Sequence, residues 1–406
     1  MKKIGLFLAA SPTSGGMFQY CQAVLEALTA LPRDRFSIVA ACASDAWKVH
    51  LDKYDIKQVS LAKKVRTLSI ANAWRLAGLP VSLWRRFAPY HPVVRTLAGE
   101  NCDLWIFPSQ DYWTYQAAVP ALGVVHDLMH RYERRFPEVS SWGRYQVRER
   151  HFGNICRWSQ AVLVDSELGK RQVQDSYGTS SDKIFVLPYV IPKYIAESQL
   201  SEYFSEKYQL PHKFIFYPAQ FWWHKNHIAL IEAMARLRSD IPDIALVLVG
   251  SQKNAFDAVK KRVRELGISN AVHFFGYVPD RDMPEFYRRA RALVMPTFFG
   301  PTNIPPLEAF ALDCPVAVSD IYGMREQLGD AALFFDPRSV SAIGNCLRDV
   351  WTDDALCSDL RARGRSHARA WTQSQFNSKF QDIIKSVTQS DACGDDVLEA
   401  VQMKSG

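Results

Sequence analysis

Short apolar runs alternate with helix-like segments along most of this 406-residue chain. In the second half, the apolar runs cover residues 214–217, 245–249, 272–275, 292–295, 316–318 and 333–335. Between them, apolar residues recur every three or four positions, which is the spacing of one helix face. The first half repeats the pattern more loosely, with runs at residues 3–10, 36–42, 104–107, 122–125, 161–164 and 185–187. Because strands that alternate with helices form a parallel sheet covered on both faces, the pattern predicts an α/β protein with two doubly wound domains.

A polar stretch that contains prolines, residues 187–212, separates the two halves and has the composition of a linker. We therefore expect an N-terminal Rossmann-like domain over residues 1–192 and a C-terminal Rossmann-like domain over residues 193–370. Residues 371–388 carry apolar positions at helical spacing, and we expect this final helix to return to the N-terminal domain. The last residues, 389–406, are polar and small, which predicts a flexible tail.

The composition is that of an ordinary globular protein, with 48% hydrophobic and 22% charged residues, and this excludes a mainly disordered chain. The eight cysteines lie far apart and include no CxxC pair, so we interpret them as reduced thiols of a cytoplasmic protein. No run approaches the roughly 18 to 20 apolar residues of a membrane span. Any membrane contact is therefore expected to be peripheral.

Positive charge is concentrated in the first half. Residues 1–192 hold 24 basic and 16 acidic side chains, a balance of +8, whereas the remainder holds 25 and 26, a balance of −1. No acidic residue occurs between Asp55 and Glu100, where basic and aromatic residues are interleaved. This stretch predicts a face for an anionic membrane or an acceptor, and the basic residues singled out are Lys63, Lys64, Arg66, Arg85 and Arg86. The alternative is an ordinary pair of basic helices whose charged side chains are solvated. Binding of nucleic acid is disfavoured, because no nucleic-acid recognition module accompanies the positive charge.

Residues suited to phosphate follow the first strand of each half. Gly15 and Gly16 form a strand-to-helix turn, where backbone N–H groups at a helix start can bind an anion; the alternative is a tight turn without a ligand. Lys225 follows the run at 214–217, at the end of the sheet where open α/β proteins bind ligands. A lysine there can neutralise a phosphate, or it can be an ordinary solvated side chain.

A carboxylate marks a third position of interest. Asn303 can cap a helix whose first turn contains prolines, and Glu308 lies close behind it. Glu308 can accept hydrogen bonds from sugar or ribose hydroxyls, or it can merely complement the helix dipole. We see no convincing Asp-x-Asp motif or other metal-binding cluster, so we expect neither a metal nor a cofactor.

These sites occur in an order that resembles the retaining nucleotide-sugar glycosyltransferases of family 4, including bacterial mannosyltransferases. The resemblance covers roughly residues 1–388. Its motifs are His126-Asp127, Lys225-Asn226, Val249-Gly250, Phe275-Gly276-Tyr277-Val278, Leu307-Glu308-Ala309 and Cys314-Pro315-Val316. The resemblance implies a GT-B architecture, in which two Rossmann-like domains face each other across a cleft. It also implies that the N-terminal domain binds the acceptor and the C-terminal domain binds the nucleotide sugar.

The resemblance implies a role for each matched residue. Gly15 and Gly16 would approach the donor diphosphate, and Lys225 would pair with it. Glu308 would bind the ribose, and His126 would contact the transferring sugar. His126 and Lys225 are thus the candidate catalytic residues, and the rest of the implied donor site is Gln220, Gly250, Thr302, Asn303 and Ile304. Because negative charge develops on the departing phosphate, a fixed cation and backbone N–H groups there should dominate catalysis without a metal.

The chain departs from the family pattern at two positions. Gln220 stands where the family usually has an arginine, and Gly300 stands where it usually has a second glutamate. One cation and one sugar contact are therefore missing or supplied differently. Two alternatives follow: a catalytically degenerate relative that binds nucleotide or glycan, and a nucleotide-sugar epimerase on the same architecture. A dinucleotide oxidoreductase is disfavoured because no GxGxxG motif follows a strand.

The expected function is transfer of a hexose to a glycan or lipid-linked glycan in the synthesis of cell-surface polysaccharide or lipopolysaccharide. Resemblance to bacterial mannosyltransferases suggests mannose from GDP-mannose, with a UDP-sugar as the alternative donor. The basic stretch suggests a protein at the inner face of the cytoplasmic membrane.

Overall fold

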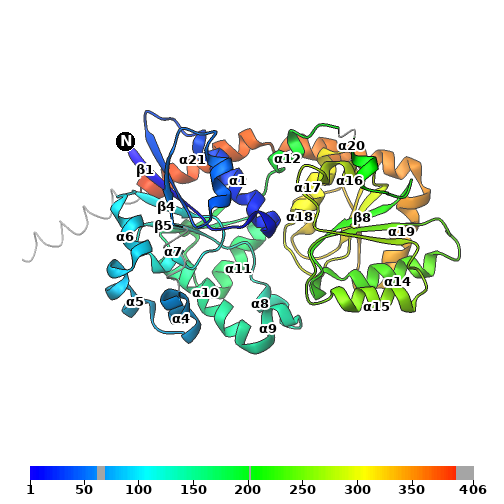
Figure 1. The fold of residues 1–406 in the computed structure, drawn as a ribbon, viewed down its shortest axis with the longest axis horizontal. Helices are drawn as coiled ribbons and strands as arrows, with labels where there is room; N and C mark the ends of the chain where they lie inside the picture. The colour runs from blue at the N-terminus through cyan, green and yellow to red at the C-terminus, as the bar shows by residue number, and fades with distance from the viewer. Residues whose placement is uncertain (62–68, 201–202, 390–406) are drawn as a thin grey trace, which may run out of the picture. The chain divides into compact units, whose positions relative to one another are not determined.

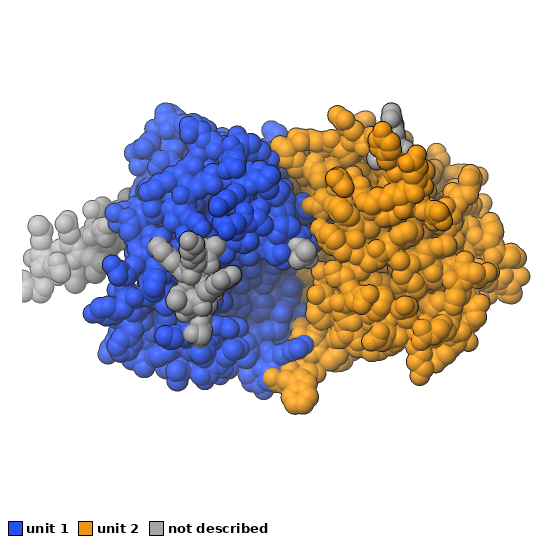
Figure 2. Space-filling view, in the orientation of Figure 1, with its two compact units in different colours: residues 1–131, 143–188, 373–406 blue, residues 132–142, 189–372 orange. Residues whose placement is uncertain are grey.

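The computed structural model describes residues 1–61, 69–200 and 203–389. The chain forms two compact units (Figures 1 and 2). Unit 1 comprises Met1–Arg131, Gly143–Pro188 and Gln373–Gly406, and unit 2 comprises Tyr132–Trp142 and Tyr189–Thr372. The change of unit after Pro188 falls within the predicted linker, whereas the short segment Tyr132–Trp142 joins unit 2 without any signal in the sequence pattern.

Unit 1 contains a parallel sheet of seven strands in the order β3-β2-β1-β4-β5-β6-β7. Its strands are β1 (Lys2–Leu8), β2 (Phe36–Cys42), β3 (Lys57–Ser60), β4 (Leu104–Phe107), β5 (Ala121–Val124), β6 (Ala161–Val164) and β7 (Ile184–Val186). Its helices are α1 (Gly16–Thr29), α2 (Lys48–Leu51), α4 (Ser69–Ala77), α5 (Val81–Phe87), α6 (Pro92–Gly99), α7 (Trp113–Gln116), α8 (Met129–Tyr132), α10 (Arg144–Trp158), α11 (Glu167–Tyr177) and α21 (Gln373–Gln389). Six of these strands match the predicted runs to within two residues. The pattern missed β3, an edge strand with Val59 as its one apolar residue.

Unit 2 contains a parallel sheet of six strands in the order β10-β9-β8-β11-β12-β13. Its strands are β8 (Ile215–Pro218), β9 (Leu246–Val249), β10 (Val272–Gly276), β11 (Ala292–Met295), β12 (Val316–Ser319) and β13 (Leu333–Phe335). Its helices are α9 (Pro137–Ser140), α12 (Lys193–Ala196), α13 (Phe204–Lys207), α14 (His227–Leu237), α15 (Phe256–Glu265), α16 (Met283–Arg289), α17 (Ile304–Ala311), α18 (Met324–Leu328), α19 (Val340–Thr352) and α20 (Asp354–Ala370). The parallel α/β prediction is therefore confirmed in both units.

The central strands of both sheets are buried along their whole length, because helices cover both faces (Figure 1). Gly5 in β1 shows how closely unit 1 is packed, since a Cβ atom there would lie 2.3 Å from the Trp105 ring of β4. The helix predicted over residues 371–388 is α21, which packs against α1 within unit 1 (Figure 1). Phe376 and Phe380 of α21 are fully buried there.

Candidate functional site

The candidate donor residues of unit 2 lie at the carboxyl ends of three neighbouring strands. Gln220 and Lys225 follow β8, Gly250 follows β9, and residues 302–304 follow β11. Because β9, β8 and β11 are adjacent in the sheet, their following loops meet at one edge. This is the edge at which open α/β sheets bind ligands.

The loop that carries Lys225 is firmly held. Residues Trp223–Lys225 form a single 3-10 turn, and the Tyr217 hydroxyl donates a hydrogen bond of 2.9 Å to the Lys225 carbonyl oxygen. Asn226 then adopts a left-handed conformation with φ of 58°, and its Nδ2 donates to the carbonyl oxygens of Pro296 and Pro337. The backbone of Lys225 is thus fixed to the strand before it and to the segment after β11.

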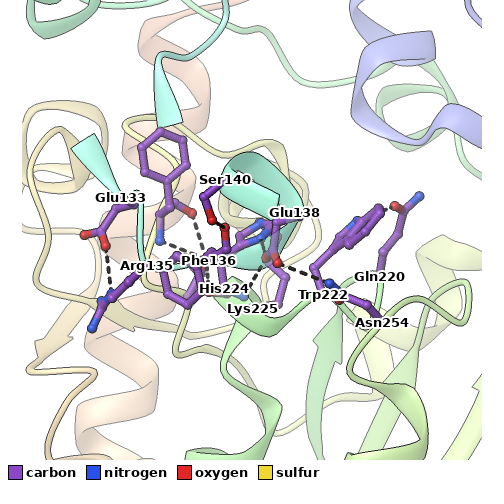
Figure 3. A network of polar contacts seen from close by, with 12 residues as sticks. Glu133, Arg135, Phe136, Glu138, Ser140, Gln220, Trp222, His224, Lys225 and Asn254 are labelled. Atoms are coloured by element: carbon purple, nitrogen blue, oxygen red, sulfur yellow. Dashed lines mark hydrogen bonds and ion pairs between the residues drawn. The ribbon is translucent and has the colours of Figure 1, made fainter. Parts of the chain in front are cut away.

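A glutamate from the short segment Tyr132–Trp142 holds the same loop (Figure 3). Glu138 Oε1 accepts a hydrogen bond of 3.0 Å from the backbone N–H of His224 and a second one from its ring Nδ1. Glu138 Oε2 accepts from Asn254. Burial acts to raise the Glu138 pKa, but the hydrogen bonds from His224 outweigh it and lower the pKa to about 2. Sequence reasoning missed Glu138, because nothing in its local pattern indicates a contact 86 residues away.

Gly250 lets two loops approach each other. Its φ is 154°, and a Cβ atom there would lie 2.2 Å from the Ala219 carbonyl oxygen, so only glycine fits. Gln220, next in the chain, accepts a hydrogen bond of 2.9 Å from the Trp222 indole N–H on its side-chain oxygen (Figure 3). An arginine has no acceptor and could not make this contact. Gln220 therefore has a structural role that the family's arginine would not fill.

Glu308 is buried in the second turn of α17, with 5% of its surface exposed. Its two carboxylate oxygens accept hydrogen bonds from the hydroxyls of Tyr194 and Tyr287. Burial raises the Glu308 pKa to about 7, although both tyrosines oppose the shift. Sequence reasoning missed both tyrosines. Tyr194 lies in the linker and Tyr287 lies 21 residues before Glu308, so neither forms a local motif with it.

The start of α17 differs from the expected capped helix. Asn303 occupies the capping position in an extended conformation, but its side chain accepts no hydrogen bond from the first turn. Instead, Asn303 Nδ2 donates to the Gly300 carbonyl oxygen, and the Asn303 backbone exchanges two hydrogen bonds of 2.8 Å with the Gln327 side chain. The capping prediction is therefore wrong. Because Pro305 and Pro306 have no N–H, only the N–H groups of neighbouring residues remain for a ligand at this helix start.

Gly300 has a backbone conformation with φ of 128°, which side chains with a Cβ rarely adopt. A Cβ atom there would also lie 2.6 Å from Asn303 Nδ2. The local backbone therefore explains why a glycine, and no glutamate, stands at this position. Thr302 and Ile304 flank Asn303 in the same loop, and Ile304 is the first residue of α17.

Unit 1 holds the remaining candidates. Gly15 caps α1 with φ of 61°, and among the described residues other than its chain neighbours no atom lies within 4 Å of the place where a Cβ would be. Gly16 begins α1. His126 follows β5 and is 9% exposed, with its ring 4.7 Å from that of Tyr20. Its Nε2 lies 3.0 Å from the Pro108 carbonyl oxygen, which can only accept, so Nε2 carries the proton. Burial lowers the His126 pKa to about 4, so the ring is neutral at pH 7.

The basic stretch of unit 1 is described in part. Lys63, Lys64 and Arg66 lie outside the described residues. Arg86 is exposed on α5, but Arg85 is half-buried with its guanidinium 4.8 Å from the centre of the Trp158 ring. Large apolar side chains are exposed on and beside α4 and α5, namely Ile70, Leu76, Leu79, Leu83, Phe87 and Tyr90.

Two further features bear on membrane and metal binding. Among the residues that the structure describes, no helix combines the length and the apolar character that a membrane crossing requires. Within the same ranges, no three His, Cys, Asp or Glu side chains come together in a way that could hold a metal ion.

Comparison with known sequences finds a family to which part of the chain is similar. Residues 202–367 match the family described as Glycosyl transferases group 1. O-antigen chain mannosyltransferase B of Escherichia coli is 25% identical over 289 residues, which cover 70% of this chain and 74% of that protein. Mannosylfructose-phosphate synthase of Agrobacterium fabrum is 24% identical over 277 residues, covering 63% and 61%. The serotype-specific mannosyltransferase WbdA of Escherichia coli is 22% identical over 299 residues, which cover 69% of this chain and 36% of that protein.

Solved structures share the whole fold. HepE of Anabaena, solved in complex with UDP and glucose, superposes with a TM-score of 0.71 at 17% identity and covers 95% of this chain and 100% of that one. Sucrose-phosphate synthase from Thermosynechococcus elongatus superposes with a TM-score of 0.69 at 17% identity, covering 96% and 100%. This likeness identifies the fold as GT-B, built from two Rossmann-like units.

Proposed function

Because residues 202–367 match the Glycosyl transferases group 1 family and the fold is GT-B, we propose that the protein is a retaining hexosyltransferase that uses a nucleotide sugar. The observation that carries this proposal is the fixed position of Lys225 at the carboxyl edge of β8, within the matched segment. Gly250, Asn303 and Glu308 follow neighbouring strands at the same edge.

The proposed chemistry follows from charge. When the bond between sugar and diphosphate breaks, negative charge grows on the phosphate, and a cation held in place stabilises it more than a mobile one. Lys225 supplies that cation, and its loop is held by hydrogen bonds to Tyr217, Glu138 and the Pro296 carbonyl oxygen. Within unit 1, Gly15 and Gly16 form an open turn at the start of α1, whose backbone N–H groups suit a phosphate. The protein itself neutralises the diphosphate, and no metal ion is required.

We assign Glu308 to a ribose hydroxyl and His126 to a sugar hydroxyl. A ribose hydroxyl would replace a tyrosine hydroxyl as the donor to Glu308, so the carboxylate stays paired in both states. His126 is neutral, with its Nε2–H directed to the Pro108 carbonyl oxygen, and we assign it to a contact with the sugar. It therefore orients the sugar and does not carry charge.

The proposed donor sugar is mannose from GDP-mannose, and the proposed acceptor is a glycan or lipid-linked glycan of a surface polysaccharide or lipopolysaccharide. Relatives named as O-antigen and serotype-specific mannosyltransferases support this choice. A UDP-sugar is the alternative donor, because HepE was solved with UDP-glucose.

Donor binding can be tested without knowing the acceptor. The full chain is heated with GDP, UDP, dTDP or ADP, and we expect one nucleoside diphosphate to raise the melting temperature. Lys225→Ala should lose that shift and at least about tenfold of the turnover, since a charge-assisted contact contributes about 1.5 to 3 kcal/mol. Lys261→Ala, on the exposed face of α15, is the matched control. Wild-type turnover in Lys225→Ala would refute the assignment, and nucleotide binding without any transfer would indicate a degenerate relative.

We also propose that the face of α4 and α5 binds the anionic inner leaflet of the cytoplasmic membrane. Arg86 and the apolar side chains around it are exposed together, and no acidic residue lies between Asp55 and Glu100 to oppose the charge. Each surface cation contributes about 1 kcal/mol at such a membrane.

Liposome sedimentation tests the membrane face. Arg86→Glu and Phe87→Ser should each reduce binding to vesicles of phosphatidylglycerol and phosphatidylcholine several-fold, because one reverses a charge and the other removes an inserted ring. Arg236→Glu, on α14 of unit 2, is the control for net charge. Equal binding by all three variants and the wild type would remove the membrane face from the proposal.

A further inference from the structure

The side chain of Glu138 joins two loops of the candidate donor site (Figure 3). Its Oε1 accepts hydrogen bonds from the backbone N–H of His224, at 3.0 Å, and from the His224 ring Nδ1, at 2.5 Å. Its Oε2 accepts one of 3.2 Å from Asn254 Nδ2. His224 directly precedes Lys225 in the β8–α14 loop. Asn254 lies in the loop between β9 and α15, which begins with Gly250. One carboxylate therefore fixes the loop of the cation against the loop of the glycine.

His224 also connects these two loops to the segment that follows β11. Its carbonyl oxygen accepts a hydrogen bond of 2.8 Å from the backbone N–H of Phe298. The Phe136 ring lies near both residues, with its centre 6.1 Å from that of the His224 ring and 5.7 Å from that of the Phe298 ring. The segments after β8, β9 and β11 are thus held together around His224, and the short segment Tyr132–Trp142 supplies the residues that hold it.

Glu138 keeps its negative charge at neutral pH. Only 7% of its side chain is exposed, and a buried carboxylate is costly unless its oxygens accept hydrogen bonds. Burial raises the Glu138 pKa, but the hydrogen bonds from His224 outweigh burial and lower the pKa to about 2. Hydrogen bonds to an ionised group are shorter and roughly twice as strong as those between neutral groups. The two loops are therefore tied by charge-assisted bonds.

The position of Lys225 is critical in this chain because Gln220 brings no second cation to the loop. Gln220 is uncharged, and its side-chain oxygen accepts a hydrogen bond from the Trp222 indole N–H. The stabilisation that this loop gives to the departing phosphate then depends on where Lys225 is held. A misplacement of about 1 Å in an active site can reduce a rate about a hundredfold. A bond that fixes the backbone just before Lys225 should therefore affect the reaction as well as the fold.

We propose that Glu138 is a positioning residue for the transfer reaction and acts by holding the Lys225 loop through His224. The proposal rests on the proposed transfer from a nucleotide sugar, and it deepens that function by naming a residue that acts without touching the donor. Loss of Glu138 should lower kcat more than it weakens donor binding, because the negative charge on the phosphate is greatest in the transition state.

The first test measures the release of nucleoside diphosphate from GDP-mannose and from UDP-glucose by the full chain, with water as the acceptor. Glu138→Gln should lower kcat at least about tenfold and change KM less than about threefold. The glutamine oxygen can accept from His224, but its amide nitrogen cannot accept from Asn254, so one loop loses its partner. Glu133→Gln is the matched control and should keep the wild-type kcat, because Glu133 lies in the same segment and pairs with Arg135 at 2.8 Å (Figure 3).

A second pair of variants tests whether the hydrogen bond to Glu138, rather than packing, holds the loop. His224→Asn keeps a donor, because the amide nitrogen of asparagine stands at the same place along the side chain as the Nδ1 of histidine, whereas His224→Leu has no donor. His224→Asn should retain most of the kcat, and His224→Leu should lose as much as Glu138→Gln. Amide hydrogen exchange of residues 220–226 and 250–255 should be faster in Glu138→Gln and His224→Leu than in Glu133→Gln.

The outcomes separate this proposal from the proposed function. Wild-type kcat in Glu138→Gln, or equal losses of kcat in His224→Asn and His224→Leu, would overturn the positioning role and leave the transferase standing. If Glu138→Gln does not fold, the two His224 variants decide the question. A wild type that releases nucleotide from neither donor would refute the transferase. Faster exchange in Glu138→Gln would then still support control of the loop by Glu138, and unchanged exchange would overturn it.

Discussion

The buried carboxyl of Glu308 should make the folded protein less stable at alkaline pH, and Glu308→Gln should remove this effect. The glutamine keeps the shape of the side chain and can still pair with Tyr194 and Tyr287, donating to one hydroxyl and accepting from the other. It cannot ionise. The difference in unfolding free energy between the wild type and the variant therefore measures how much the ionisation of Glu308 destabilises the folded protein.

The magnitude follows from the pKa of Glu308, which is about 7 in the folded protein against an ordinary value of 4.5. Each pKa unit corresponds to about 1.4 kcal/mol, so this difference sets a limit of about 3 kcal/mol at high pH. Because the folded pKa is raised, this carboxyl adds stability as the pH falls from about 7 towards 4.5 and removes it as the pH rises. Glu308→Gln should exceed the wild type by about 1 kcal/mol at pH 5 and by about 3 kcal/mol at pH 8.

Urea denaturation of the full chain at pH 5, 6, 7 and 8 measures this difference. Glu206→Gln, at an exposed position of α13, is the control and should change the unfolding free energy by less than about 0.5 kcal/mol at every pH. A Glu308→Gln advantage that is the same at pH 5 and pH 8, or that shrinks as the pH rises, would refute the reasoning. The variant should also bind the donor nucleotide more weakly, so stability and function would change in opposite directions.

Two glycine substitutions test the backbone of the site. Gly250→Ala should lower the unfolding free energy by about 1 to 3 kcal/mol and abolish the nucleotide-induced melting shift, because its Cβ would meet the Ala219 carbonyl oxygen at 2.2 Å. A fully stable variant would show that the loops carrying Ala219 and Gly250 can separate without cost. Gly300→Glu, which restores the family's residue, should lower stability by a similar amount owing to its φ of 128° and its contact with Asn303. Higher activity in Gly300→Glu would contradict this. Gly99→Ala in α6, where a Cβ meets no atom within 4 Å, is the control for both in thermal denaturation and should be neutral or stabilising.

Much of the fold was predictable from the sequence because buried parallel strands produce short continuous apolar runs. The runs at residues 36–42, 104–107 and 292–295 coincide with β2, β4 and β11. The strand β3 was not predictable from its apolar content, since an edge strand need bury little. The membership of Tyr132–Trp142 in unit 2 was not predictable either, because it depends on long-range contacts such as that of Glu138 with His224.

The candidate site was predictable only where its residues stand in a local motif. Lys225, Gly250 and Glu308 each follow a recognisable strand, and their adjacency then follows from the strand order. The partners of Glu308 were not predictable, because Tyr194 and Tyr287 reach it from other elements. The failed cap at Asn303 has a local origin, since the second and third helical positions are Pro305 and Pro306, which have no N–H to donate to the Asn303 side chain.

The return of α21 to unit 1 makes unit 2 an insertion within another unit's sequence. Unit 1 is assembled from three separate stretches of the chain, and its last helix is made only after the whole of the long stretch of unit 2. A truncated chain that stops at Thr372 would therefore lack a helix of unit 1 and expose the surface that Phe376 and Phe380 cover. During synthesis, unit 1 cannot complete its core until unit 2 has left the ribosome. A chimaera that exchanges unit 2 needs junctions on both sides of it, as well as a matching replacement for residues 132–142.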